Sequence, residues 1–171
     1  MTREELSTSV VKHRDTVYRV ALGYVKNVHD ADDITQNVFM KLYNHTRGFE
    51  TEESRKAWLI RVAINECKDL LKSIWRANRA DLTEISDESL VAPVYDEFGL
   101  CEYVRALKPK YRTVIYLHYF EGYSTKEIGR ILKMPQSTVT THLNRARKQL
   151  KQDILDENEK ERNNYELQGF I

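Results

Sequence analysis

Hydrophobic residues recur every three or four positions along most of the chain, the spacing of an amphipathic α-helix. This spacing predicts helices over residues 3–26, 30–44, 54–75, 95–107 and 109–122. No run of alternating polar and apolar residues is long enough to predict a strand. The pattern therefore predicts an all-α protein.

Residues 122–152 predict a helix-turn-helix. Ser124 and Glu127 have the spacing of a capping box at a helix start, and Pro135 separates that helix from a second one starting near Ser137. Apolar residues of the second helix share one face: Val139, Leu143, Ala146 and Leu150. Its other face carries side chains suited to base edges and phosphates: Gln136, Thr138, Thr140, Thr141, Asn144, Arg145 and Lys148. This motif indicates DNA binding.

The helical pattern stops at residues 81–93, which are rich in acidic residues and read as a linker. We therefore expect two small helical domains joined by an acidic linker. The N-terminal helical bundle would span residues 1–80, the linker 81–97 and the helix-turn-helix domain 98–153. Residues 154–171 would form a polar tail that frays beyond the last helix.

The net charge of this 171-residue chain is only +1, but the charge is segregated along the sequence. Residues 81–102 carry seven acidic side chains and no basic one, whereas residues 103–150 carry ten basic and two acidic side chains. A basic block that holds the helix-turn-helix is the electrostatic footprint of a DNA-binding module.

Several classes of protein are disfavoured by the sequence. No apolar run approaches the length of a membrane helix, and the N-terminus lacks the apolar core of a signal peptide, so we expect a cytoplasmic protein. Cys67 and Cys101 are far apart, and His118 and His142 fall on different predicted helices without further ligands, so we expect no metal or cofactor. No phosphate loop or nucleophile motif indicates an enzyme.

Two separate segments match one family. Residues 30–43 (DADDITQNVFMKLY) and 57–72 (AWLIRVAINECKDLLK) resemble region 2 of bacterial sigma factors, and residues 107–151 resemble region 4. The order of the segments and the short linker resemble the extracytoplasmic-function (ECF) class. This resemblance implies a promoter-specific transcription initiation factor that binds core RNA polymerase, recognises −35 and −10 promoter DNA and assists promoter melting.

A different class of protein also uses a helix-turn-helix. In that alternative the chain is a promoter-specific regulator whose N-terminal helices form a dimerisation or sensor module. Such a module has no reason to carry both region 2 motifs, so the sequence favours the sigma factor.

The resemblance assigns roles to residues of the N-terminal half. The face expected to dock on the polymerase β′ clamp helices carries Asp33, Gln36 and Asn37, the last replacing a usual acidic residue. Contacts to the −10 element would come from Phe49, Arg61, Asn65, Lys68, Lys72 and Arg76. The alternatives are a core anchor for Phe49, a buried amide for Asn65 and a solvated face for the cations. We expect Trp58, Val62 and Ala63 in the core.

In the C-terminal half the resemblance assigns the −35 contacts to Ser137, Thr138, Thr140, Thr141, Asn144, Arg145 and Lys148. Arg147 would contact phosphate or pair with Glu121 or Glu127. The tyrosines of residues 111–123 would lie in the core or face the polymerase β flap. The implied partners are core RNA polymerase, promoter DNA and an anti-sigma factor, with nucleoid association through polymerase and no membrane insertion.

Overall fold

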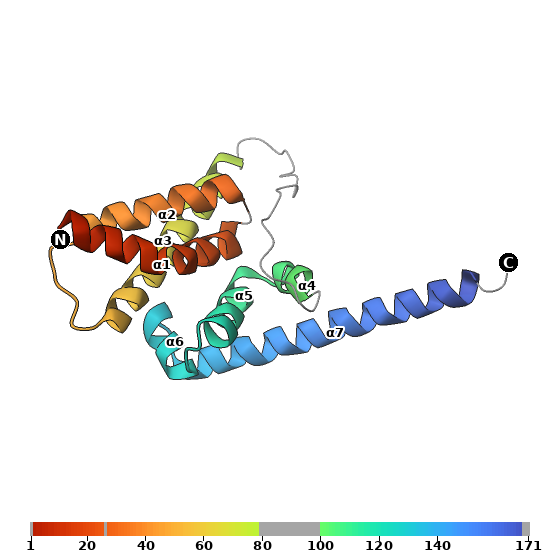
Figure 1. Ribbon diagram of the computed structural model, residues 1–171. Coiled ribbons are helices and arrows are strands. Elements are labelled where there is room, and N and C mark those ends of the chain that lie inside the picture. Colours follow the sequence, from red (N-terminus) through yellow and green to blue (C-terminus); the bar gives the residue numbers. More distant parts are fainter. Residues whose placement is uncertain (1, 26, 79–99, 169–171) are drawn as a thin grey trace. The chain divides into compact units, whose positions relative to one another are not determined.

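The computed structural model describes residues 2–25, 27–78 and 100–168, and every regular element among them is a helix (Figure 1). The chain forms two compact units. The first contains α1 (Arg3–Val25), α2 (Val28–Tyr43) and α3 (Glu52–Asn78). The second contains α4 (Leu100–Ala106), α5 (Pro109–Ile115), the π-helical turn η1 (Tyr116–Phe120), α6 (Thr125–Leu132) and α7 (Gln136–Gln168). The predicted all-α fold with two helical domains is confirmed; the predicted linker, residues 81–97, lies outside the described residues.

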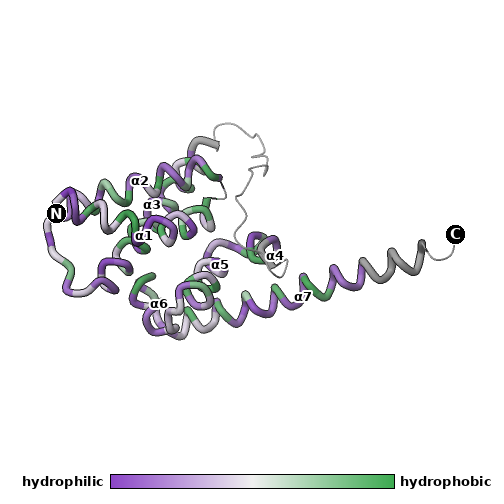
Figure 2. Tube along the Cα trace, viewed as in Figure 1, coloured by the Kyte–Doolittle hydropathy of each residue, from purple (hydrophilic) through white to green (hydrophobic). Residues whose placement is uncertain are grey.

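The N-terminal unit is a bundle in which α1, α2 and α3 pack against one another. Each helix alternates hydrophobic and hydrophilic stretches (Figure 2). Its core includes Val17, Ala21, Val38, Leu42, Leu59 and Ile60. Each buried aliphatic side chain of this size stabilises the fold by about 1.5–3 kcal/mol, so this shared core fixes the three helices relative to one another.

Residues of α3 expected in the core differ in their burial. Ala63 is fully buried, but Trp58 and Val62 are only half-buried, so that part of the prediction is wrong. Farther along the helix, burial raises the pKa of the Cys67 thiol to about 12. Cys67 is therefore a small protonated core residue, as its place in the helical pattern indicates.

The start of α2 lies earlier than the sequence predicts. Asn27 is the N-cap: its side-chain oxygen accepts hydrogen bonds from the backbone N–H groups of His29 (2.8 Å) and Asp30 (3.2 Å). Asp30, where the sequence predicts the helix to begin, instead lies in its first turn, where a carboxylate favours the positive end of the helix.

A π-helical turn interrupts the helix predicted over residues 109–122. The backbone N–H of Glu121 donates to the carbonyl of Tyr116 five residues earlier, at 3.2 Å, and Gly122 then reverses the chain at φ +73°. A π turn holds more residues than an α turn and therefore changes which side chains face a neighbouring helix. Buried residues around this segment form the C-terminal core: Leu107, Val114, Leu117, Ile128, Val139 and Leu143.

The helix-turn-helix has the predicted capping box. The Glu127 carboxylate accepts from the Ser124 backbone N–H at 2.8 Å, and the Ser124 hydroxyl accepts from the Glu127 backbone N–H at 3.3 Å. The Ser124 hydroxyl also donates to the Glu127 carboxylate at 2.6 Å, and this bond, followed by the one from the Ser124 backbone N–H, holds the pKa of Glu127 below its ordinary value. At the other end of α6, Lys133 adopts a left-handed conformation (φ 53°), and the Met134 N–H donates to the Gly129 carbonyl at 2.9 Å. This bond closes the helix in the manner of a Schellman motif.

The second helix of the motif is longer than predicted. The sequence predicts its end near residue 152, followed by a fraying tail, whereas α7 continues to Gln168 (Figure 1). The extension is polar, and its described part carries Asp156, Glu157 and Glu159 as exposed residues. Without tertiary packing such a segment has little apolar surface to bury, which is why the pattern of hydrophobic residues does not predict it.

Gly129 should be indispensable to the turn. A Cβ at this position would lie 2.9 Å from the Met134 carbonyl oxygen and 3.6 Å from the Gln136 nitrogen, both in the backbone. We predict that Gly129→Ala destabilises the C-terminal unit by about 1–3 kcal/mol, because the turn must open to admit the methyl group. Hydrogen exchange of the amides of α6 and α7 in the full chain measures this loss.

The matched control is Gly23→Ala in α1, where an added Cβ meets no atom within 4 Å. This variant should be more stable by about 0.5–1 kcal/mol, because alanine favours a helix interior over glycine. Unchanged protection of α6 and α7 in Gly129→Ala would contradict the close-approach argument.

Candidate nucleic-acid and polymerase interfaces

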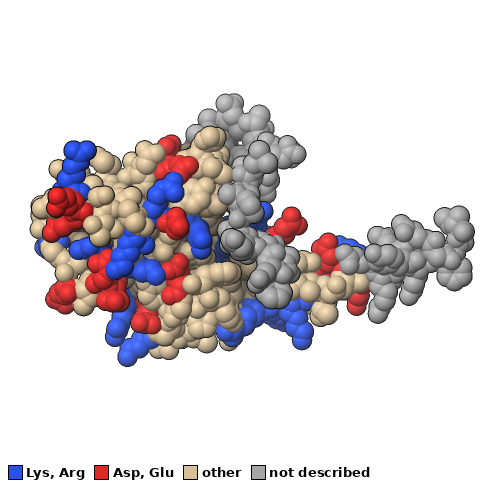
Figure 3. Space-filling view, viewed as in Figure 1, with Lys and Arg blue, Asp and Glu red and all other residues tan. Residues whose placement is uncertain are grey.

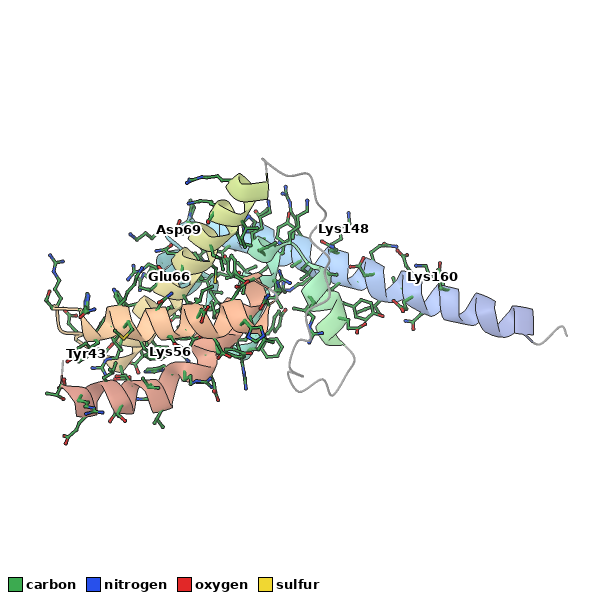
Figure 4. The ribbon with its side chains drawn as sticks, turned by 90° about the horizontal axis from the view of Figure 1, so that it is seen from above. Tyr43, Lys56, Glu66, Asp69, Lys148 and Lys160 are labelled. Carbon is green, nitrogen blue, oxygen red and sulfur yellow. The ribbon has the colours of Figure 1, made fainter. Side chains whose placement is uncertain are left out.

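One exposed face of α2 carries all three residues predicted to dock on polymerase. Asp33, Gln36 and Asn37 are exposed, on the side of the helix away from the buried Ile34, Val38 and Leu42. The same face continues to Met40 (58% exposed) and to Tyr43 (47% exposed) at the end of α2 (Figure 4). The sequence does not predict Met40 and Tyr43 as contact residues, although they follow Gln36 by four and seven residues, the spacing of one helix face.

The loop between α2 and α3 is anchored by an aromatic cluster. The Phe49 ring lies 5.0 Å from the His45 ring and 5.7 Å from the Trp58 ring, and His45 and Trp58 are 4.7 Å apart. The Arg55 guanidinium lies over Phe49 at 5.6 Å from the ring centroid. Phe49 is half-buried, so the structure gives it the anchoring role while leaving part of the ring accessible.

Glu52, the first residue of α3, is the hub of a polar network beside this loop. Its carboxylate lies 2.5 Å from Nε2 of the buried His13 and 3.2 Å from a nitrogen of Arg55. The pKa of Glu52 is lowered, chiefly by the hydrogen bond with His13 and then by the charges of Arg55 and Lys12 against the opposing effect of burial. Arg55 also donates to the Ser9 hydroxyl at 3.1 Å, so the network joins α1 to the end of the loop.

Polar side chains predicted to contact the −10 element follow one face of α3. Arg61 is half-buried, and the exposed members are Asn65, Lys68, Lys72 and Arg76. The alternative of a buried amide for Asn65 is therefore wrong. Lys72 pairs with Asp69 at 3.2 Å, and Lys41 of α2 pairs with Glu66. Both acidic residues lie along α3 (Figure 4), so part of the positive charge near this face is already compensated.

The helix-turn-helix places its predicted DNA-reading residues on one side of α7. Val139, Leu143 and Ala146 are buried, whereas the residues assigned to the −35 element are exposed except for the half-buried Thr138. Lys148 projects from the helix (Figure 4), and basic side chains gather along this part of α7 (Figure 3). The Thr140 and Thr141 hydroxyls donate to the carbonyls of Gln136 and Ser137 at 3.1 and 2.9 Å. Their methyl groups remain for apolar contact with a thymine.

Arg147 lies against Tyr119 of η1: its Nε donates to the Tyr119 hydroxyl at 2.8 Å. The sequence predicts a phosphate or an acidic side chain as the partner of Arg147 and does not predict this tyrosine. His142 belongs to no group of three or more neighbouring His, Cys, Asp or Glu side chains among the described residues. Its pKa is lowered by partial burial and by the charges of Lys110 and Arg145, which disfavour a proton on the ring.

Comparison with known proteins agrees with this geometry. Residues 10–77 match the family model for Sigma-70 region 2, and residues 101–150 match the model for Sigma-70 region 4. RNA polymerase sigma factor YlaC of Bacillus subtilis is 30% identical, with the match covering 89% of this chain and 99% of YlaC. ECF RNA polymerase sigma factor SigW of the same organism is 29% identical over 84% of this chain and 86% of SigW.

Solved structures share the fold. The sigma factor RpoE of Bartonella quintana, in complex with the anti-sigma factor NepR, superposes with a TM-score of 0.76 at 20% identity, covering 90% of this chain and 98% of that one. CnrH, in complex with the cytosolic domain of CnrY, has a TM-score of 0.64 at 22% identity and covers 91% of this chain and 90% of its own.

Two helical units, the second built on a helix-turn-helix, and matches to both sigma regions define a transcription initiation factor of the sigma-70 type. The chain belongs to the ECF sigma factors, which direct RNA polymerase to specific promoters. No helix in the described part of the chain has the length and apolar character needed to cross a membrane.

The Glu52 network should make the N-terminal unit sensitive to acid. Because the pKa of Glu52 is lower in the folded state than its ordinary value of 4.5, its stabilising bonds are present above that pH and lost as the pH falls through the folded-state pKa. Replacing Glu52 by Gln should therefore reduce the pH dependence of unfolding of α1–α3 below pH 4.5. Urea unfolding measured over pH 3–7 tests this.

The control Glu50→Gln makes the same change of charge at an exposed residue of the loop. Equal pH slopes for the wild type and Glu52→Gln would show that Glu52 is not linked to folding.

Proposed function

We propose that the two units divide the work of promoter recognition. In this proposal residues 1–80 bind core polymerase and the −10 element, residues 98–153 bind the −35 element, and residues 81–97 link them. The observation that carries the proposal is the sidedness of α7, whose buried Val139, Leu143 and Ala146 leave the base-reading residues exposed on one face. The protein acts as a binding factor rather than an enzyme, without a cofactor, in the cytoplasm and on the nucleoid through polymerase.

Docking on the β′ clamp helices is supported by the composition of the α2 face. Asp33, Gln36 and Asn37 supply charge and hydrogen-bonding groups, and Met40 and Tyr43 add exposed apolar surface that a partner would remove from water. An apolar anchor beside a polar rim is the usual anatomy of a protein interface. We therefore extend the proposed docking face from Asp33 to Tyr43.

Recognition of the −10 element is supported by the exposed amide of Asn65 and by the anchored loop. Unstacking a base costs a few kcal/mol, and polar and aromatic groups that receive the base recover this cost. Asn65 would receive the base, Phe49 would provide an aromatic surface beside it, and Lys68 and Lys72 would follow the phosphates.

Recognition of the −35 element is supported by the chemistry of the exposed α7 face. Arginine matches guanine O6 and N7, asparagine matches adenine, and threonine methyl groups match thymine, which fits Arg145, Asn144 and Thr141. Lys148 would contact phosphate.

Membership of the sigma factor family supports two proposed protein partners. Tyr119 and Phe120 are each 56% exposed, which supports a contact with the polymerase β flap. An anti-sigma factor is a further proposed partner, supported by the complex of RpoE with the anti-sigma factor NepR. Transcription by core polymerase from a promoter library, with and without this chain, tests the whole proposal. Transcripts should start at promoters sharing two spaced elements, and a library without such enrichment would refute it.

The α2 face gives a direct prediction for polymerase binding. Asp33→Arg combined with Gln36→Ala should abolish association with core polymerase, because a reversed charge in a docking face costs several kcal/mol. Co-elution in size-exclusion chromatography measures binding, and circular dichroism verifies that the helices persist. Asp15→Arg, a reversal of an exposed charge on α1, is the control and should bind normally. Wild-type co-elution of the double variant would exclude this face.

The α7 face gives a second prediction. Arg145→Ala should weaken binding at one −35 position by about 1–3 kcal/mol and relax base choice there, because a bidentate contact is lost. Lys148→Ala should weaken binding to all sequences alike and reduce its salt dependence, because the contact is to phosphate. Promoter-library selection at two salt concentrations separates these effects. If neither variant changes selection, α7 does not read the promoter.

A further inference from the structure

Arg147 lies at one flank of the exposed face of α7. At about 100° per residue, Arg147 is about 60° from Asn144 and about 160° from Arg145 around the helix axis. Asn144 and Arg145 are exposed and belong to the proposed base-reading residues. A helix that enters a groove with these two residues toward the bases presents Arg147 to a groove wall.

A tyrosine holds Arg147 in two ways. Its Nε donates to the Tyr119 hydroxyl at 2.8 Å, and its guanidinium carbon lies over the same ring at 5.6 Å from the centroid. Both side chains are exposed, so the contact contributes little to the core. The contact between Arg147 and Tyr119 depends on the π turn of residues 116–120, because Tyr119 belongs to this turn.

We propose that Tyr119 is a positioning residue for promoter recognition, which holds Arg147 on the flank of α7 in the orientation that meets the −35 DNA. The inference rests on the proposed DNA-reading role of α7. A free arginine loses several rotamers when it binds, and prior immobilisation removes that cost from the binding step.

The type of partner explains why a tyrosine serves here. A carboxylate would orient the guanidinium but would also neutralise its charge. A phenol hydroxyl accepts the hydrogen bond and leaves the positive charge available to DNA phosphates. The arrangement therefore orients Arg147 without weakening its attraction to DNA.

The test is a double-mutant cycle in holoenzyme reconstituted from the full chain. Affinity is measured by fluorescence anisotropy for a promoter fragment with its −35 element and for one in which that element is scrambled. Tyr119→Phe should reduce the −35-dependent affinity about two- to tenfold, the range for immobilising one long side chain. This loss should vanish in an Arg147→Ala background.

The matched control is Tyr18→Phe, which alters a tyrosine with Arg14 over its ring at 5.8 Å in the N-terminal unit. It should leave the −35-dependent affinity unchanged.

The outcomes separate the two proposals. If Arg145→Ala and Arg147→Ala both leave the −35-dependent affinity unchanged, the role of α7 fails and the positioning role fails with it. If Arg145→Ala weakens binding but Arg147→Ala or Tyr119→Phe does not, only the positioning role is overturned. The same holds if the losses from Arg147→Ala and Tyr119→Phe simply add.

Discussion

The burial of three residues of α7, Val139, Leu143 and Ala146, determines what the C-terminal unit can do. A helix is rigid and its period is fixed, so burying one face decides which side chains face solvent. The close approach of Gly129 to the Met134 carbonyl sets the turn before α7, and the capping box fixes the start of α6. Packing, turn and cap therefore act together to present one polar face, and a change in any of them would rotate the reading surface.

In the proposed function, the N-terminal unit must hold the loop between α2 and α3 in place for recognition. Loops are usually the least constrained parts of a fold. Here the aromatic cluster of His45, Phe49 and Trp58 closes the loop on one side, and the network of Glu52 with His13 and Arg55 closes its end. A polar network that is half-buried is specific in its geometry, since an unpaired buried group would be costly. These contacts therefore give the loop a defined structure in the absence of DNA.

Periodicity in the sequence predicts most of the helices and both faces of α7, because burial of one stripe is a local pattern. It does not predict the π turn, since a shift from four- to five-residue hydrogen bonding leaves the hydrophobic pattern unchanged. Asn27 and Asp30 are both good caps three residues apart, so local chemistry alone does not choose between them. Met40 and Tyr43 are apolar, so the sequence does not predict them as contact residues, although the structure exposes them. The pair of Tyr119 with Arg147 of α7 depends on tertiary packing between helices and has no local signal.

The two proposed DNA-binding faces differ in how they treat positive charge. Near the −10 face, Lys72 pairs with Asp69 and Lys41 pairs with Glu66, so phosphates would have to compete with carboxylates for these cations. On α7, Arg147 donates to a tyrosine hydroxyl, which leaves its charge intact. Counterion release scales with the number of phosphates that free cations neutralise. The −35 contact is therefore suited to salt-dependent attraction of duplex DNA, and the −10 contact to recognition of exposed bases, where stacking and hydrogen bonding matter more than net charge.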